Sequence, residues 1–167
     1  MGDEIKGKAV SDSRVTLSQV MQPEMANTQG NVHGGWIMKL VDEAGALACI
    51  RHSRQRVVTV AVDQLTFDHP ILIGNLVVLE AEVSWVGRTS MEAEVNVFAE
   101  NLRKEQRWHT NTAYVVYVAL DDNERPTEVP PLIPETEAHK IRMNQAEERQ
   151  AYRLRQRKQK LERDIMP

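Results

Sequence analysis

Four residues in a short glycine-rich stretch have types and spacing that suit chemistry on a carbonyl group. The segment GNVHGGWIMKLVDEAG, residues 30–45, holds His33, Gly34, Gly35 and Asp42. Glycine is a poor helix former, yet two glycines stand where an apolar helical pattern begins, and an aspartate interrupts that pattern further on. The stretch is therefore either an ordinary buried helix that contains a few residues unfavourable for a helix, or part of an active site.

The start of this helix offers backbone hydrogen-bond donors to a ligand. The first N–H groups of a helix lack intrahelical partners and carry a partial positive charge. Gly34 and Gly35 have no side chains to cover those groups, and Asn31 adds a neutral donor or acceptor just ahead of them. This arrangement suits a carbonyl oxygen that becomes negative in a transition state.

Asp42 lies about two helical turns beyond the glycines, too far to serve the same helix end directly. A two-fold dimer would instead bring Asp42 of one subunit toward the helix start of the other. A carboxylate in that position could activate water for attack on an ester-like carbonyl. The spacing is thus compatible with a hydrolytic site shared between two chains.

Each of these residues also has a purely structural interpretation. Asn31 could cap the helix, the two glycines could relieve close packing against a sheet, and Asp42 could pair with Lys39 three residues earlier. A lone histidine such as His33 near a helix start is typically structural, and Cys49 is typical of a small buried apolar residue. Residue types and spacing alone leave both interpretations open.

Composition places the chain among ordinary globular proteins. Its 167 residues, 41% hydrophobic and 27% charged, are enough for one domain with an appendage. The net charge of -3 gives no general attraction to nucleic acid. A single cysteine allows neither an internal disulfide nor a cysteine-based zinc site. The amino terminus lacks the apolar core of a secretory signal, and no segment is long and apolar enough to span a membrane. We therefore expect a cytoplasmic protein with no metal and no stable membrane insertion.

Hydrophobic periodicity predicts one apolar helix among several strands. Apolar residues recur at helical spacing from Gly34 to near Arg51, and runs rich in β-branched and aromatic residues follow. The expected strands cover residues 14–21, 56–67, 75–86, 90–101 and 107–120. A compact hairpin connection is expected at 87–90 and a longer polar one at 102–106. A turn or crossover is expected at 68–74, and a charged helix over 135–163.

This order of elements predicts an α+β fold, in which an antiparallel sheet wraps around one long central helix. The helix and the sheet can bury each other's apolar faces, which is the hotdog arrangement, and a further helix follows at the carboxyl end. Such a core is thin, so dimerisation through sheet edges is expected. We predict a flexible tail over 1–13, a hotdog domain over 14–134 and a charged helical extension over 135–167.

The motifs resemble a known family. GNVHGGWIMKLVDEAGALACIRH, VVTVAVDQLTF and VGRTSMEAEVNVFAE are similar to segments of hotdog-fold acyl-CoA thioesterases, above all the bacterial acyl-CoA hydrolases and the cytosolic long-chain (brain-type) acyl-CoA hydrolase. The resemblance extends over roughly residues 14–150. It implies hydrolysis of a medium- to long-chain fatty acyl-CoA to free fatty acid and coenzyme A. Coenzyme A is then part of the substrate and a product, and no separate cofactor is expected.

The resemblance also implies site residues and an assembly. The family's catalytic asparagine corresponds to Asn31 and its catalytic aspartate to Asp42, and His33, Gly34 and Gly35 fall in its oxyanion region. In that family the two catalytic residues meet from different hotdog units across a dimer. A single unit holding both implies a homodimer with two equivalent sites, and family members commonly form trimers of dimers.

A site for the phosphates of coenzyme A is implied at the turn GRTS, where Arg88, Thr89 and Ser90 are candidates. Arginine can hold a phosphate through two hydrogen bonds, although Arg88 could equally be a solvated turn residue. The basic segment at 153–160 is offset by acidic residues upstream, so it favours a solvated helix or an intersubunit brace over a site for a polyanion.

Two other classes of hotdog protein remain as alternatives. One is a protein that binds acyl-CoA without cleaving it. The other is an enoyl-CoA hydratase or dehydratase, which needs a His/Asp or His/Glu pair to move protons on carbon. The combination of Asn31 and Asp42 fits water attack on a thioester better than either.

Overall fold

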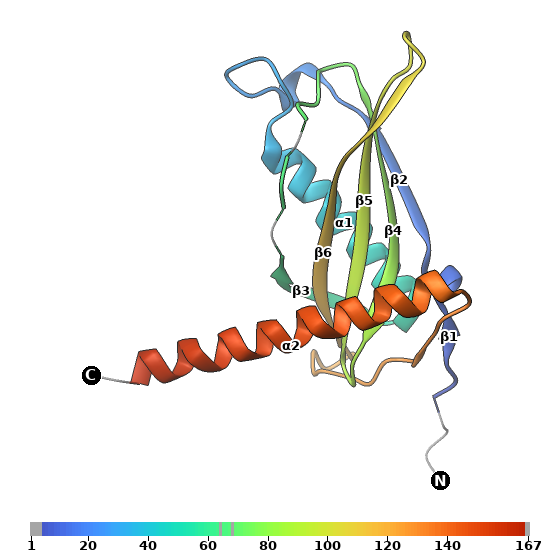
Figure 1. Ribbon diagram of the computed structural model, residues 1–167, viewed down its shortest axis with the longest axis vertical. Helices are drawn as coiled ribbons and strands as arrows, with labels where there is room; N and C mark the ends of the chain where they lie inside the picture. Colours follow the sequence, from blue (N-terminus) through green and yellow to red (C-terminus); the bar gives the residue numbers. More distant parts are fainter. Residues whose placement is uncertain (1–4, 64, 68, 166–167) are drawn as a thin grey trace.

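The computed structural model describes residues 5–63, 65–67 and 69–165. These form a curved five-stranded sheet with one helix on each side and a small two-stranded sheet (Figure 1). The strands are β1 (Lys8–Ala9), β2 (Val15–Val20), β3 (Arg56–Val62), β4 (Leu76–Val86), β5 (Ser90–Asn101), β6 (Gln106–Leu120) and β7 (Leu132–Ile133). The helices are α1 (Gly34–Ser53) and α2 (Glu137–Ile165), with short 3-10 turns at Val10–Ser13 and Pro23–Met25.

The main sheet has five strands in the order β2-β4-β5-β6-β3, and every neighbouring pair is antiparallel. It curls around α1 (Figure 1). Pairing between β3 and β6 sets Thr59 opposite Tyr117, so both side chains face the helix. The predicted hotdog arrangement, an antiparallel sheet wrapped around one long helix, is confirmed.

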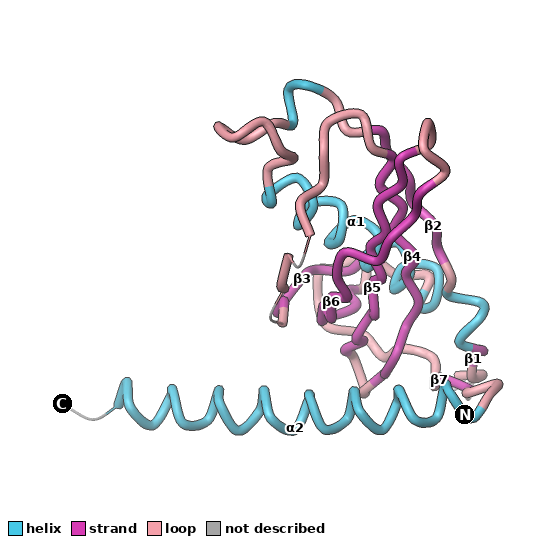
Figure 2. The backbone as a smooth tube through the Cα atoms, turned by 45° about the horizontal axis from the view of Figure 1, so that its top comes forward, coloured by secondary structure: helices cyan, strands magenta, loops and turns pink. Residues whose placement is uncertain are grey.

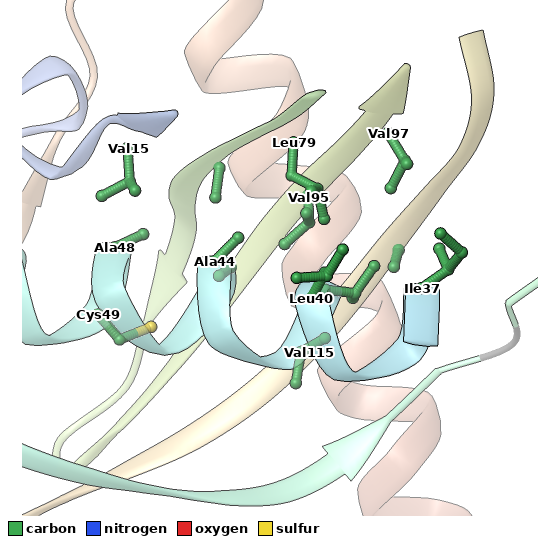
Figure 3. Close-up of a cluster of buried hydrophobic side chains, with 14 of the residues drawn as sticks. Val15, Ile37, Leu40, Ala44, Ala48, Cys49, Leu79, Val95, Val97 and Val115 are labelled. Atoms are coloured by element: carbon green, nitrogen blue, oxygen red, sulfur yellow. The ribbon is translucent and has the colours of Figure 1, made fainter. Parts of the chain in front are cut away.

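The core lies between α1 and the concave face of the sheet. Ile37, Leu40, Ala44 and Ala48 recur on one side of the helix, and each is at most 2% exposed. They pack against valines and leucines of the strands (Figure 3). The small alanines let the helix approach the sheet closely, and Cys49 is fully buried among them, as an apolar residue would be.

Helix α2 crosses the opposite face of the sheet and extends past it (Figure 2). Three arginines on one side of the helix bind carboxylates that point outward from the strands. Arg142 lies 2.7 Å from Glu82, and Arg149 and Arg153 each lie 2.7 Å from Glu92. Glu92 is completely buried, as is Ala146 of the helix, so α2 is docked by buried ion pairs together with a few apolar contacts.

The prediction of a flexible tail over residues 1–13 is wrong for Lys8 to Ser13. Strand β1 pairs with β7 in parallel, Val10 is 3% exposed in the core, and the Ser13 hydroxyl accepts a hydrogen bond from the Val83 N–H at 2.9 Å. Residues 1–4 lie outside the described residues. The segment is ordered because it fills the gap between the sheet and the strand that precedes α2.

Other predicted element boundaries differ from those in the structure by a few residues. The predicted strand 56–67 ends at Val62, where β3 leaves the sheet, and Gln64 within it lies outside the described residues, as does Asp68 in the predicted turn 68–74. Helix α1 ends at Ser53 rather than near Arg51, because Arg54 takes a left-handed conformation at its carboxyl end.

Strand β3 is an edge of the sheet and exposes apolar side chains. Val58, Val60 and Val62 are between 44% and 55% exposed, which is typical of an edge that pairs with another chain. Dimerisation through this edge stays a prediction. No helix within the described residues is long and apolar enough to cross a membrane, and the cytoplasmic location also stays a prediction.

Candidate active site

His33 is the residue that caps α1. Its Nδ1 accepts a hydrogen bond from the Gly35 N–H at 2.9 Å. A Cβ atom on Gly35 would lie 3.0 Å from that nitrogen, so glycine makes room for the cap. The alternative of Asn31 as the cap is therefore wrong, and the Gly35 N–H is engaged rather than open to a ligand, contrary to its predicted place among the oxyanion donors. The Gly34 N–H has no partner among the described residues.

Two asparagines lie in the loop that precedes α1. The Asn27 Oδ1 accepts hydrogen bonds from the N–H groups of Gln29 and Asn31, at 2.9 Å and 3.1 Å. With its oxygen held by the backbone, the Asn27 side chain has its NH₂ group left to donate. The backbone of Asn31 pairs with Asn27 and with Leu72, which fixes the loop against the following segment.

Both asparagines line a pocket of about 230 Å³ at the start of α1. Gly34 and the ring of Phe67 form part of its wall, and a Cβ on Gly34 would lie 3.4 Å from that ring. The pocket thus combines an apolar wall, two carboxamides and a helix amino terminus. This combination suits a polarised carbonyl attached to an apolar chain.

Asp42 is half-buried and receives two side-chain donors from the sheet. The Thr59 hydroxyl donates to Asp42 Oδ1 at 2.6 Å, and the Tyr117 hydroxyl lies 3.3 Å from the same oxygen and 2.8 Å from the Asp42 main-chain oxygen. Oδ2 is the oxygen left to accept a proton. The alternative pairing of Asp42 with Lys39 is wrong, because Lys39 binds Glu43 at 2.6 Å.

Burial fixes the protonation of Tyr117, which touches this carboxylate, and of Cys49, which lies further along α1. Burial raises the pKa of the Tyr117 hydroxyl, and the nearby negative charge of Asp42 raises it further. Burial likewise raises the pKa of the Cys49 thiol. Both groups stay protonated at neutral pH, so Tyr117 acts as a hydrogen-bond donor and Cys49 is not a nucleophile.

One chain does not bring Asn31 and Asp42 together. Asp42 is eight residues along α1 from Gly34, about 12 Å at the rise of a helix, and it is not among the residues that line the pocket. Within one chain the candidate residues therefore form two separate groups, one at the start of α1 and one at its middle.

The residues of the turn that is expected to bind phosphates are not among those that line the pocket at the start of α1. Arg88 is exposed and 3.7 Å from Glu128. The Gly87 N–H donates to the Ser90 carbonyl, which closes the turn. Thr89 and Ser90 line a hollow of about 570 Å³ between the sheet and α2, which also contains Arg157.

The sequence analysis did not single out Asn27, Thr59 or Tyr117. Thr59 and Tyr117 are ordinary strand residues by type, and only the strand register places them opposite Asp42. Asn27 lies in a loop of polar residues. Within the described ranges, no group of three or more His, Cys, Asp or Glu side chains could hold a metal ion.

Comparison with known proteins identifies relatives of this chain. A family model for the thioesterase superfamily matches residues 29–106. The chain is 35% identical over 138 residues to the uncharacterized acyl-CoA thioester hydrolase YkhA of Bacillus subtilis, a match that covers 83% of this chain and 80% of that protein. The structure of an apo-hexameric acyl-CoA thioesterase has a TM-score of 0.87 and 32% identity, over 91% of this chain and 97% of that one.

An acyl-CoA hydrolase from Staphylococcus aureus is also similar. Its structure in complex with butyryl coenzyme A, coenzyme A and coenzyme A disulfide has a TM-score of 0.84 and 29% identity, over 95% of this chain and 99% of that one. Alanine variants of that enzyme replace an asparagine at its position 28, an aspartate at 43 and a threonine at 60. Sequence identity of 35% over 83% of the chain, together with the shared fold, shows that this chain belongs to the thioesterase superfamily.

Proposed function

We propose that this protein is an acyl-CoA thioesterase that hydrolyses medium- to long-chain fatty acyl-CoA to a fatty acid and coenzyme A. One observation carries the proposal: the Asp42 carboxylate is held through Oδ1 by Thr59, which leaves Oδ2 available as a base. A half-buried carboxylate with one oxygen fixed and the other free suits the activation of water.

The spacing of the altered residues in the S. aureus hydrolase supports this assignment. Its positions 28, 43 and 60 are separated by 15 and then 17 residues. In this chain the same residue types at the same separations are Asn27, Asp42 and Thr59. Asn27 thus joins Asn31 as a candidate for the catalytic asparagine, and both line the same pocket.

In the proposed reaction, the thioester carbonyl binds in the pocket at the start of α1. The Gly34 N–H and an asparagine NH₂ donate to its oxygen, which becomes negative as the tetrahedral intermediate forms. Asp42 Oδ2 takes a proton from water, and the water oxygen attacks the carbonyl carbon. The C–S bond then breaks, and the thiolate of coenzyme A takes up the proton, so water and thioester yield carboxylic acid and thiol.

The proposal requires two chains, because about 12 Å separates the two groups of candidate residues within one. A two-fold dimer formed along the edge of β3 would cover the exposed Val58, Val60 and Val62 and would give two equivalent sites. The hexameric relative supports further assembly as a trimer of dimers. Arg88, Thr89 and Ser90 remain our candidates for the phosphates of coenzyme A, and the reaction needs no other cofactor.

The test compares wild-type protein with Asp42→Asn on palmitoyl-CoA and crotonyl-CoA. We expect thiol release from palmitoyl-CoA by the wild type, and a loss of at least about 100-fold in the variant. Loss of the enoyl chromophore of crotonyl-CoA without thiol release would indicate a hydratase instead. Binding of acyl-CoA with no turnover, or full turnover by a folded Asp42→Asn variant, would contradict the proposal.

The structure favours hydrolysis over hydration for a specific reason. A hydratase needs a His/Asp or His/Glu pair to move protons on carbon, whereas neither His33, which caps α1 through Nδ1, nor His69 in the pocket wall is hydrogen-bonded to Asp42 in this chain. The carboxylate of Asp42 is bound to hydroxyl groups rather than to an imidazole.

A further inference from the structure

Tyr117 stands directly beneath the middle of α1 and touches the residue that the proposed reaction uses as its base. It is the largest of the completely buried side chains and comes from the concave face of β6. Its hydroxyl donates to the main-chain oxygen of Asp42 at 2.8 Å and lies 3.3 Å from Oδ1 of the same residue. A single phenol therefore contacts both the backbone and the carboxylate of Asp42.

The helix makes room for this hydroxyl. A Cβ atom on Gly45 would lie 2.5 Å from the Tyr117 oxygen and 3.1 Å from its ring, which is closer than a side-chain carbon tolerates. Gly45 therefore leaves space for both the ring and the hydroxyl of Tyr117. Glycine inside a helix costs about 1 kcal/mol relative to alanine. The pairing of Gly45 with Tyr117 is explained if the Tyr117 hydroxyl itself is needed at Asp42.

Two hydroxyl groups contact the carboxylate of Asp42. Thr59 reaches Oδ1 from β3, and Tyr117 reaches it from the neighbouring β6, so the oxygen is held from two strands. On α1 itself, Lys39 is engaged by Glu43 and does not compete for Asp42. Because burial keeps the phenol protonated, its donor is always present.

We propose that Tyr117 is a positioning residue for Asp42, which orients the carboxylate so that Oδ2 faces the attacking water. The inference rests on the proposed thioester hydrolysis and adds to it a residue that does not touch the substrate. Gly45 belongs to the same arrangement, because it provides the space that the phenol occupies.

The primary test is Tyr117→Phe, which removes only the hydroxyl. The hydroxyl contacts the Asp42 main-chain oxygen at 2.8 Å and Oδ1 at 3.3 Å, and its removal frees both, so we expect kcat to fall about 10-fold or more while KM stays within about twofold. Tyr114→Phe is the matched control: Tyr114 lies on the same strand, and its ring stacks on Arg149 on the outer side of the sheet, 3.6 Å from the guanidinium carbon. We expect this control to keep its kcat.

A second pair of variants separates positioning from packing. In an Asp42→Asn background, Tyr117→Phe should cause little further loss of the residual rate, because the carboxylate that it orients is gone. Gly45→Ala should displace the hydroxyl and lower kcat in the same way, without adding to the effect of Tyr117→Phe. Each variant is assayed at a temperature below its own unfolding midpoint, so that a loss of folded protein is not mistaken for a decrease in kcat.

The outcomes distinguish this inference from the proposed function. If the wild type releases thiol and Asp42→Asn does not, a Tyr117→Phe variant with unchanged kcat overturns the inference alone. An equal fractional loss from Tyr117→Phe in the wild-type and Asp42→Asn backgrounds overturns it too, because the hydroxyl would then act on packing. A wild type that releases no thiol overturns the proposed function, and this inference with it.

Discussion

Thr59 and Asp42 are joined by a hydrogen bond of 2.6 Å between the threonine hydroxyl and Oδ1 of the carboxylate. The bond connects the edge strand β3 to the middle of α1, and Thr59 is aligned with Tyr117 of β6 across the strand pair. The edge of the sheet that is expected to meet a second chain is thus also the edge that orients the proposed base.

The first prediction follows from this bond. Thr59→Ala should lower kcat by about 10- to 100-fold, because a hydrogen bond to a charged group is worth about 1.5–3 kcal/mol. Thr59→Ser keeps the hydroxyl and should keep most of the activity. Steady-state kinetics with palmitoyl-CoA measure both variants, and equal activity of the alanine and serine variants would show that the hydroxyl is not needed.

The second prediction separates the two candidate asparagines. We expect Asn27→Asp to lose about 100-fold or more in kcat, because it retains the oxygen that accepts the Gln29 and Asn31 N–H groups but replaces the NH₂ donor with a second oxygen. We expect a smaller loss from Asn31→Ala. Circular dichroism and the unfolding midpoint check that the loop is intact.

The reverse order of these two losses would assign the catalytic role to Asn31, as the motif alone suggests. Equal and small losses would remove both carboxamides from the mechanism and leave the helix amino terminus as the sole donor to the carbonyl oxygen.

Much of the fold could be predicted from periodicity. Alternating residues define β4 and β5, and the apolar residues of α1 recur at helical spacing, so that one helix against one antiparallel sheet was the natural solution. Residues Lys8 to Ser13 could not be predicted in this way. Only Val10 among them is strongly apolar, and its turn packs against α1 and β4, while Lys8 and Ala9 pair with a strand more than 100 residues later.

The candidate site was predictable only where a motif marks it. Asp42 stands out in an apolar helix, whereas Thr59 and Tyr117 have residue types that any strand favours. The role of α2 was missed for a similar reason. Glu92 has the polar character expected of a solvent-facing strand position, and only the structure shows that α2 buries it beneath Arg149 and Arg153.

The third prediction concerns the docking of α2. Glu92→Gln leaves the guanidinium groups of Arg149 and Arg153 without their buried carboxylate, and breaking a buried ion pair typically costs about 3–5 kcal/mol. We expect α2 to detach, which limited trypsin digestion after its basic residues would detect. Glu80→Gln is the control, because it removes an exposed pair with Arg107 and should cost less than about 1 kcal/mol.

The fourth prediction is a dependence of stability on pH. His52 is completely buried, and burial lowers its pKa from 6.5, although the hydrogen bond to the Pro130 carbonyl opposes this effect. The unfolded chain therefore binds a proton at this residue at a higher pH than the folded protein does. As pH falls below about 6.5, the free energy of unfolding should decrease.

His52→Gln tests this assignment, because glutamine keeps a donor for the Pro130 carbonyl and does not titrate. Urea unfolding at about pH 8 and about pH 5.5 should show a smaller decrease in the variant than in the wild type. The same decrease in both proteins would assign the pH dependence to other groups.

The last prediction addresses the shared site. The pocket with Asn27 and Asn31 and the carboxylate of Asp42 are about 12 Å apart in one chain, so we expect each complete site to take one half from each of two chains. Two inactive variants, Asn27→Asp and Asp42→Asn, should therefore recover activity when their subunits exchange.

In a mixed dimer one site receives both intact halves and the other receives neither. Random exchange makes half of the dimers mixed, and about a quarter of all sites should regain activity. Native mass spectrometry confirms that exchange has occurred. Exchanged dimers without recovered thiol release would show that each chain builds its own site, because every site would then still hold one altered residue.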